Sequence, residues 1–302
     1  MITLAITHCN RLKYLRALIN SLQGFIQLSR PQLLLVDNGS VESGVAEYLK
    51  DLSQEWEVLS RDPSSRNWVN DEYIAKNWII DRAAHDVILF LQDDSELVVT
   101  PDHLARLISS FLTLPHLAME IEGVRRVTVD RRTGGAIARS PGVHEKVDPH
   151  FPTHGLFKTS LLRENGPYRV DWPLDRMYWG RSEDEYDARL KSKYNHSLIS
   201  CIAKVPCFAS VWNDPRGGYA FIRDNRRWGH YRSPVNGSYY IPLNDHQIEF
   251  LEEGRRPCAF LDIAQPNEWR IAKDHTGEIH KYPQSSVLIE GPASSLESSD
   301  DI

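Results

Sequence analysis

Residues 87–96 read VILFLQDDSE, an apolar run of five residues followed by a glutamine and two adjacent aspartates. Such a run is typical of a strand that is buried on both faces of a sheet. Two carboxylates directly after it need water or a compensating partner, because an isolated buried charge is costly. Two interpretations are open: the acids form a solvated strand end, or they hold a cation together with whatever that cation binds.

The composition is that of a globular protein. The chain has 302 residues, 41% of them hydrophobic and 25% charged, which suffices for one large domain or two small ones with a real core. The formal net charge of −6 provides no basic field that would gather a polyanion. We therefore expect no nucleic-acid partner.

The cysteine content and the hydropathy indicate a reducing compartment. The 4 cysteines contain no C-x-x-C pair, and the first residues lack the basic and apolar regions of a signal peptide. No apolar run approaches the roughly 20 residues that cross a bilayer. The expectation is a cytoplasmic protein without a transmembrane segment, associated with a membrane only peripherally if at all.

Strand and helix patterns alternate along the first third of the chain. Apolar runs at residues 2–6, 33–36 and 87–91 predict buried strands, and residues 57–61 form a weaker candidate. Asn10 is expected to cap the first of the helices. The segments with helical spacing are residues 12–22, 45–52, 71–84 and 101–111. This alternation predicts an α/β fold with a Rossmann-like, mostly parallel sheet and helices on both faces.

Three polar stretches follow predicted strands directly. They are residues 8–11 (HCNR), 37–40 (DNGS) and 92–95 (QDDS). Ligands of parallel sheets bind at the carboxyl ends of the strands, so we place the candidate site where these stretches meet. A second acidic stretch, residues 178–187 (YWGRSEDEYD), lies in the second half of the chain, where the periodicity is weak.

The strand-end motifs resemble family 2 glycosyltransferases with the GT-A fold. The similarity runs through ITLAITHCNRLKYLRALINSL, LLLVDNGS and NDEYIAKNWIIDRAAHDVILFLQDDSEL. The later segment MYWGRSEDEYDARLK is similar to the tryptophan-glycine and glutamate-aspartate segment of inverting GT-A enzymes, including the β-1,4-galactosyltransferases.

The resemblance implies a division of the chain into three parts. Residues 1–100 would form the nucleotide-sugar-binding half of a GT-A domain, and residues 101–240 its acceptor-binding and catalytic half. Residues 241–302 would form a C-terminal extension. The serine- and acid-rich composition beyond about residue 285 predicts a disordered tail.

The resemblance also assigns roles on the donor side. A leaving nucleoside diphosphate is usually neutralised by a hard divalent cation such as Mn²⁺ or Mg²⁺. In the family, the last aspartate of a D-x-D signature contacts that metal, which implies that Asp94 is a metal ligand and that Asp93 orients the ribose or metal-bound water. Gln92 stands where the family has its first acid.

Further donor contacts follow from the other motifs. Asp37 stands where the family's aspartate binds the uracil imide, although a turn-forming Asp-Asn-Gly predicts the same residue. His8 and Cys9 are expected to line the base pocket, without the tyrosine ring that the family usually places there. Arg66 and Lys76 are the basic candidates for the diphosphate, and each is otherwise an ordinary surface cation.

Part of the second acidic stretch has a purely structural explanation. Ser182 and Glu185 have the spacing of a capping box at a helix start. Glu185 with Arg189, and Asp187 with Lys191, have the spacing of i,i+4 ion pairs on that helix. These contacts account for two of the four acids.

Glu183 and Asp184 remain, where the resemblance places an acceptor-binding acid and the catalytic base. Asp184 would deprotonate the acceptor hydroxyl as it attacks the anomeric carbon from the face opposite the diphosphate, which inverts the configuration. Trp179, next to Gly180, can stack on an acceptor ring or simply pack. His230 is the candidate for a downstream metal ligand, although a lone histidine is more often structural.

The expected function is an inverting glycosyltransferase. Its donor would be a nucleotide sugar, with a UDP-sugar favoured, its cofactor a divalent cation, and its acceptor a glycan or another hydroxyl compound. Two alternatives stay open. One is a noncatalytic sugar- or nucleotide-binding protein on a GT-A fold, and the other is a sugar-phosphate nucleotidyltransferase, for which the first strand lacks a glycine-rich opening.

Overall fold

A mixed sheet forms the centre of the protein, with strand order β3-β2-β1-β4-β8-β6-β9-β7. The computed structural model describes residues 1–65, 70–121, 143–145, 152, 154–172, 181–203, 205, 207–210, 248, 270–273 and 279–282. The strands of this sheet are β1 (Thr3–His8), β2 (Gln32–Asp37), β3 (Glu57–Ser60), β4 (Val87–Gln92), β6 (Ala118–Glu120), β7 (Val143–Glu145), β8 (Gly155–Lys158) and β9 (Ser200–Ala203).

Helices follow or precede most of these strands. They are α1 (Leu12–Ser29), α2 (Val45–Leu52), α3 (Asp71–Arg82), α4 (Pro101–Thr113), α5 (Thr159–Asn165), α6 (Arg181–Lys193) and α7 (His196–Ile199), with a 3-10 turn at Pro63–Ser65. Within the described residues, no helix is both long and apolar enough to cross a membrane.

The strands pair in parallel from β3 to β4, as the apolar runs predict. Beyond β4 the pairing is mixed: β8 is antiparallel to both β4 and β6, β6 and β9 are parallel, and β7 is antiparallel to β9. The predicted α/β fold with a mostly parallel sheet is therefore confirmed. The antiparallel part comes from the short strands that follow α4, in a region where the sequence shows little periodicity.

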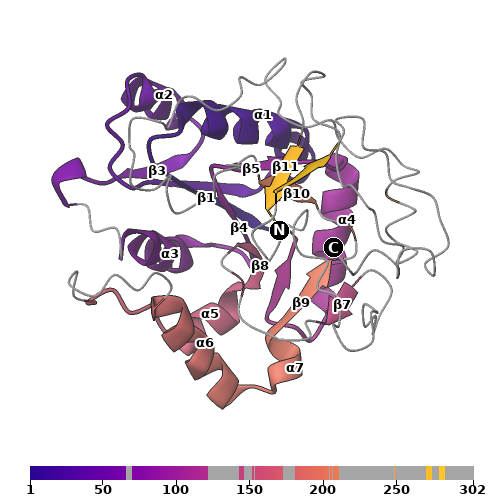
Figure 1. Cartoon of the computed structure of the whole chain (residues 1–302). Coiled ribbons are helices and arrows are strands. Elements are labelled where there is room, and N and C mark those ends of the chain that lie inside the picture. The colour runs from indigo at the N-terminus through magenta and orange to yellow at the C-terminus, as the bar shows by residue number, and fades with distance from the viewer. Residues whose placement is uncertain are drawn as a thin grey trace.

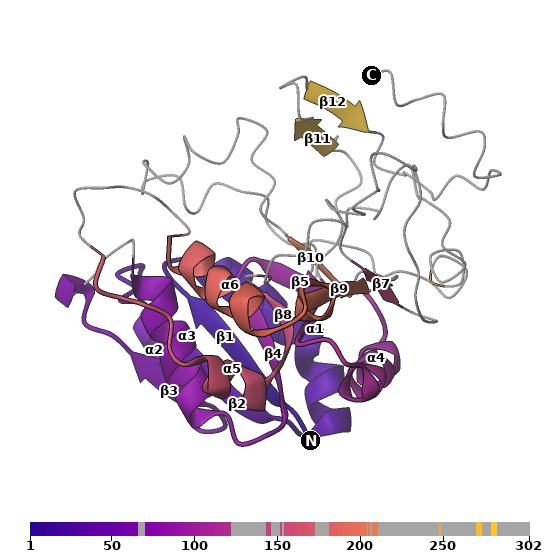
Figure 2. The same ribbon diagram turned by 90° about the horizontal axis from the view of Figure 1, so that it is seen from below.

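Helices cover both faces of the sheet (Figure 1). Alternate residues of β4 point to opposite faces: Leu89 belongs to a core with α1, α2 and α4, whereas Phe90 belongs to a core with α3, α5 and α6. Figure 2 shows the second group of helices lying across the sheet. Burial on both faces explains why the sequence of β4 is continuously apolar.

The loops after β1 and β2 are joined by reciprocal hydrogen bonds. Asn10 has a left-handed backbone (φ 53°), and its side-chain oxygen accepts hydrogen bonds from the backbone N–H groups of Val41 (2.6 Å) and Glu42 (3.1 Å). In return, the Glu42 carboxylate accepts a hydrogen bond from the backbone N–H of Leu12 at 3.1 Å. The expectation that Asn10 caps α1 was wrong, because the cap is supplied by Glu42 from the neighbouring loop.

Two smaller sheets involve the later parts of the chain. Strand β5 (Ser95–Leu97) pairs antiparallel with β10 (Phe208–Ser210), so the segment directly after the aspartate pair is held by the second half of the chain. Strands β11 (Arg270–Lys273) and β12 (Ile279–Tyr282) form an antiparallel pair in the predicted C-terminal extension. The predicted disordered tail lies outside the described residues.

The start of β8 requires glycine. Gly155 has a φ of +134°, and a Cβ added there would collide with the carbonyl oxygen of Met119 on β6. We expect Gly155→Ala to lower the free energy of unfolding by about 2–5 kcal/mol, because backbone strain adds to a steric clash. Urea unfolding measures this change.

The exposed Ser160 on α5 provides the control. Ser160→Ala should change the free energy of unfolding by less than about 0.5 kcal/mol. A Gly155→Ala protein as stable as the wild type would contradict the strained approach of β8 to β6.

Candidate functional site

The three polar stretches meet at one edge of the sheet. Strands β2, β1 and β4 are neighbours and run parallel, with His8 paired to Asp37, and Thr7 paired to Gln92. The residues that are predicted to bind the nucleotide-sugar donor therefore lie side by side at these strand ends. Pairing alone determines this, because parallel strands that start together also end together.

The acid pair after β4 is compensated by an internal cation. The Arg11 guanidinium forms an ion pair with Asp93 and donates a hydrogen bond of 2.9 Å to Asp94. The other oxygen of Asp93 lies 2.8 Å from Nδ1 of His8 and accepts a hydrogen bond of 3.2 Å from the backbone N–H of Cys9. The side chains of Asp93 and His8 are fully buried.

These contacts control the ionisation of Asp93. Burial acts to raise the pKa of its carboxyl group, but the opposite charge of Arg11 and the hydrogen bond with His8 outweigh burial and hold the pKa below its usual value. The pKa of Arg11 is raised, since its two carboxylate partners outweigh its own burial. Asp93 is therefore a buried anion whose charge the protein itself balances.

The sequence itself indicates that Arg11 is the cationic partner of the aspartate pair. A buried carboxylate needs a cation, and Arg11 is the one lysine or arginine in the three strand-end stretches. Neither of the two initial interpretations of the acid pair describes Asp93, because its partner is neither bulk water nor an external cation. Asp94, whose side chain is 6% exposed, lies nearer the surface.

The described residues contain no group of three histidine, cysteine or acidic side chains that could hold a metal ion. Divalent cations at phosphate sites are often held by one or two carboxylates, with phosphate oxygens and water as the other ligands. Asp94 fits such a shared site only if the diphosphate contributes ligands. Arg11 must then share Asp94 with the cation or turn toward the phosphates.

Asp37 forms the turn that its sequence predicts. Its carboxylate accepts hydrogen bonds from the hydroxyl of Ser40 and, at 3.1 Å, from the backbone N–H of Ser40. Its own carbonyl accepts a hydrogen bond from the backbone N–H of Arg61 at 2.9 Å. Each carboxylate oxygen has a second lone pair, so the turn does not prevent Asp37 from binding a base imide as well.

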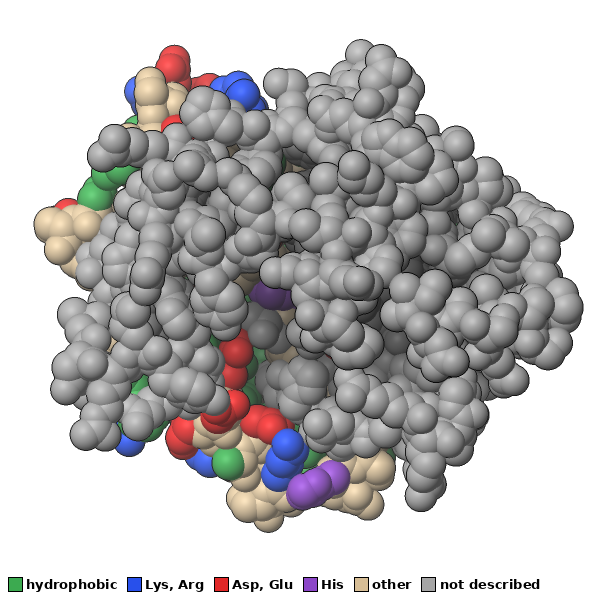
Figure 3. Space-filling view, in the orientation of Figure 1, with side chains coloured by type: hydrophobic (Ala, Val, Ile, Leu, Met, Phe, Trp, Pro, Cys, Tyr) green, Lys and Arg blue, Asp and Glu red, His purple; other side chains and the backbone are tan. Residues whose placement is uncertain are grey.

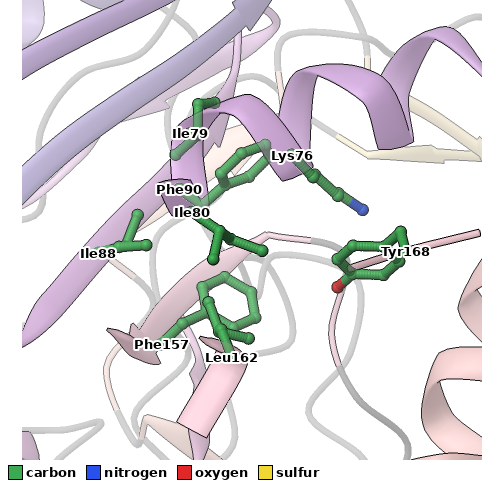
Figure 4. A pocket seen from close by; sticks show the side chains of 8 residues that line it. All are labelled: Lys76, Ile79, Ile80, Ile88, Phe90, Phe157, Leu162 and Tyr168. Carbon is green, nitrogen blue, oxygen red and sulfur yellow. The ribbon is translucent and has the colours of Figure 1, made fainter. Parts of the chain in front are cut away.

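Lys76 is the buried member of a polar network whose carboxylates are 32% (Glu72) and 30% (Glu183) exposed, and it is not the surface cation of the alternative interpretation. Its side chain is 5% exposed, and its Nζ lies 3.1 Å from Glu72 and 3.2 Å from Glu183. Gln92 donates a hydrogen bond of 3.2 Å to the same oxygen of Glu72. Figure 4 shows the Lys76 side chain extending from α3 toward Tyr168 at a pocket with otherwise apolar walls.

The start of α6 differs from the capping box that its sequence suggests. Ser182 lies inside the helix and is completely buried. Its hydroxyl donates to the carbonyl of Arg169 at 2.5 Å and accepts from the indole N–H of Trp172 at 2.9 Å. The capping-box interpretation was wrong, because tertiary contacts with the preceding segment take up the hydroxyl.

The rest of α6 agrees with the sequence. The ion pairs Glu185–Arg189 (2.8 Å) and Asp187–Lys191 (2.6 Å) are confirmed. Asp184 is exposed on this helix, next to Glu183. Acidic side chains gather on the face of the molecule where Figure 1 places α6 (Figure 3).

Four predicted site residues lie outside the described residues and stay predictions. They are Arg66, Trp179, Gly180 and His230.

The fold and the edge of the sheet define a class of α/β protein that binds its ligand at the strand ends. Residues 3–160 match the family described as Glycosyl transferase family 2. The match covers more than half of the chain, and the chain belongs to this family. A search of the curated proteins finds no match.

Several solved structures are similar to the chain at low identity. S. aureus TarS 1-349 in complex with UDP-GlcNAc has 14% identity and a TM-score of 0.48, with 70% of this chain and 59% of that chain covered. Mannosyltransferase PcManGT from Pyrobaculum calidifontis, in complex with GDP-Man and Mn²⁺, has 16% identity and a TM-score of 0.48, with 74% and 60% covered. The chain spans 37% of the longer TarS structure.

A third structure matches over nearly the whole chain. Glucosyl-3-phosphoglycerate synthase from Mycobacterium tuberculosis, in complex with Mn²⁺, UDP and phosphoglyceric acid, has 12% identity and a TM-score of 0.47, with 98% of this chain and 91% of that chain covered.

The Arg11–Asp93 pair can be tested by stability. Arg11→Met leaves a buried carboxylate without its cation, so we expect the free energy of unfolding at pH 7 to fall by about 3–5 kcal/mol in urea unfolding. As a control, Arg82→Met removes the exposed pair with Glu57, which should matter by less than about 1 kcal/mol.

The pH dependence of this difference has a defined sign. Because the folded-state pKa of Asp93 lies below the unfolded value, the contribution of the pair is present above about pH 4 and is lost as the pH falls through the folded pKa. The difference in the free energy of unfolding between the wild type and Arg11→Met should become smaller in acid. A gap of constant size down to about pH 2.5 would show that Asp93 is not the ionised partner.

Proposed function

We propose that this glycosyltransferase moves a sugar from a nucleoside-diphosphate sugar, with a UDP-sugar as the favoured donor, to a hydroxyl of a glycan or another acceptor, with inversion at the anomeric carbon. The observation that carries the proposal is the convergence of Asp37, Asp93 and Asp94 at neighbouring strand ends in a chain of this family.

On the donor side, the residues at the carboxyl ends of the strands are proposed to bind the nucleotide. Asp37 has acceptor capacity left for a base imide, and His8 and Cys9 stand beside it at the end of β1. Asp94, with Asp93 behind it, would hold a Mn²⁺ or Mg²⁺ ion, which when bound would neutralise the leaving diphosphate. Arg66 is retained as a candidate for the diphosphate.

On the acceptor side, the proposed base is Asp184, which is exposed at the start of α6. As the acceptor oxygen bonds to the anomeric carbon and the bond to the diphosphate breaks, the hydroxyl proton passes to the Asp184 carboxylate. Glu183 and the Trp179–Gly180 pair are candidates for holding the acceptor. His230 is the candidate for completing the metal coordination.

The donor can be identified by nucleotide release. Incubation with UDP-, GDP- and TDP-sugars in the presence of Mn²⁺ or Mg²⁺ should release nucleoside diphosphate, fastest from a UDP-sugar, and a chelator should slow the release. No release from any donor, together with UDP binding that Asp94→Ala leaves unchanged, would favour the noncatalytic sugar-binding alternative.

The two acidic residues should have separable effects. Asp184→Asn should lower the rate of transfer by about 10²–10⁴-fold, because the general base is lost, while calorimetry shows unchanged UDP binding. Asp94→Ala should instead weaken the metal-dependent part of that binding. Asp187→Asn is the matched control on α6, since it changes an acid of the same helix that pairs with Lys191. Equal loss of UDP affinity in both variants would refute the assignment of the base.

A further inference from the structure

A continuous polar network joins the end of β4 to the start of α6. It runs from the Gln92 amide to Glu72, from Glu72 to Lys76 and from Lys76 to Glu183, with contacts of 3.2, 3.1 and 3.2 Å. Gln92 immediately precedes the aspartate pair, and Glu183 immediately precedes the proposed base. The network therefore connects the two acidic stretches, which lie far apart in the sequence.

Burial among aromatic rings disfavours the charge of Lys76, and two neighbouring carboxylates compensate for it. Its Nζ lies over the rings of Tyr73 (5.2 Å), Tyr168 (5.3 Å) and Phe90 (5.8 Å), in cation–π geometry. Burial acts to lower the pKa of Lys76, but Glu72 and Glu183 outweigh burial and raise it. Lys76 therefore stays charged, and its charge needs both carboxylates.

The network also explains the glutamine in the acid motif. A glutamate at position 92 would face the carboxylate of Glu72 across about the same distance, with repulsion in place of a hydrogen bond. The Gln92 amide donates where an acid would accept. The departure from the D-x-D pattern thus serves the contact with α3.

The aromatic rings extend the connection to the body of α6. Tyr168 stacks on Tyr73 of α3 with ring centroids 5.6 Å apart, and on Tyr186 of α6 at 3.9 Å. Lys76 thus contacts a stack that ends on α6 and an acid in the first turn of α6. Lys76 is therefore linked to α6 directly at Glu183 and, through the ring of Tyr168, indirectly at Tyr186.

We infer that Lys76 is a positioning residue: through Glu183 and the tyrosine stack it sets the start of α6, and with it Asp184, relative to the strand end that carries Asp94. This inference rests on the proposed function. A general base must stand within hydrogen-bonding reach of the attacking hydroxyl, and a misplacement of about 1 Å can cost about 10²-fold in rate.

The first test separates turnover from donor binding. In Lys76→Met, UDP release from UDP-glucose or UDP-N-acetylglucosamine, whichever the wild type uses, should fall in kcat by about 10–100-fold. UDP affinity by calorimetry should stay within about twofold, and Glu183→Gln should behave alike. Arg82→Met on the same helix, whose ion pair is exposed, should match the wild type.

The second test uses an exchange of charge. Gln92→Glu should lower kcat, because it places a second carboxylate against Glu72. Adding Glu72→Gln, which restores one amide and one acid, should recover most of the lost kcat. A simple loss of packing would not be rescued by this second substitution.

The third test does not depend on activity. In the free protein, hydrogen exchange of α6 amides should be faster in Lys76→Met than in the wild type, with α4 unchanged. Unchanged kcat, unchanged α6 exchange, or UDP affinity that falls as much as kcat would each overturn the positioning role. An inactive wild type would count against the proposed function, and α6 exchange would then decide on Lys76 alone.

Discussion

The ion pair between Arg11 and Asp93 is the constraint on which the site depends. Asp93 follows a strand whose first five residues are buried, and its carboxylate is fully excluded from solvent. Its charge persists because the guanidinium, His8 and a backbone N–H all bind it. The same contacts hold the loop after β1 against the end of β4. They therefore determine both the charge balance and the shape of the site.

This pair divides the two aspartates into different roles. Asp93 is occupied by the protein's own groups, while Asp94 is nearer the surface and pairs with the same Arg11. A divalent cation or a diphosphate that arrives at this edge meets an arginine already in place. Arg11 has the fork-shaped donor set that suits phosphate as well as carboxylate.

A second buried cation acts on the opposite side of the same strand end. Lys76 balances Glu72 and Glu183 as Arg11 balances Asp93 and Asp94. The two cations come from different elements, the loop before α1 and the helix α3, and both reach the end of β4. Arg11 contacts the aspartates after β4 directly, whereas Lys76 is linked to the strand end through Glu72, which accepts a hydrogen bond from Gln92.

The sequence by itself determined the parallel half of the fold and the location of the site. Strands buried on both faces are continuously apolar, and parallel strands end at a common edge, so local composition sufficed to place residues 8–11, 37–40 and 92–95 together. Only the tertiary structure decided which side chains pair there. The contacts of Arg11 with Asp93, and of Lys76 with Glu183, join residues about 80 to 107 positions apart and depend on strand order, which periodicity does not specify. For the same reason Asn10 and Ser182 carried local capping signals that distant partners overrode.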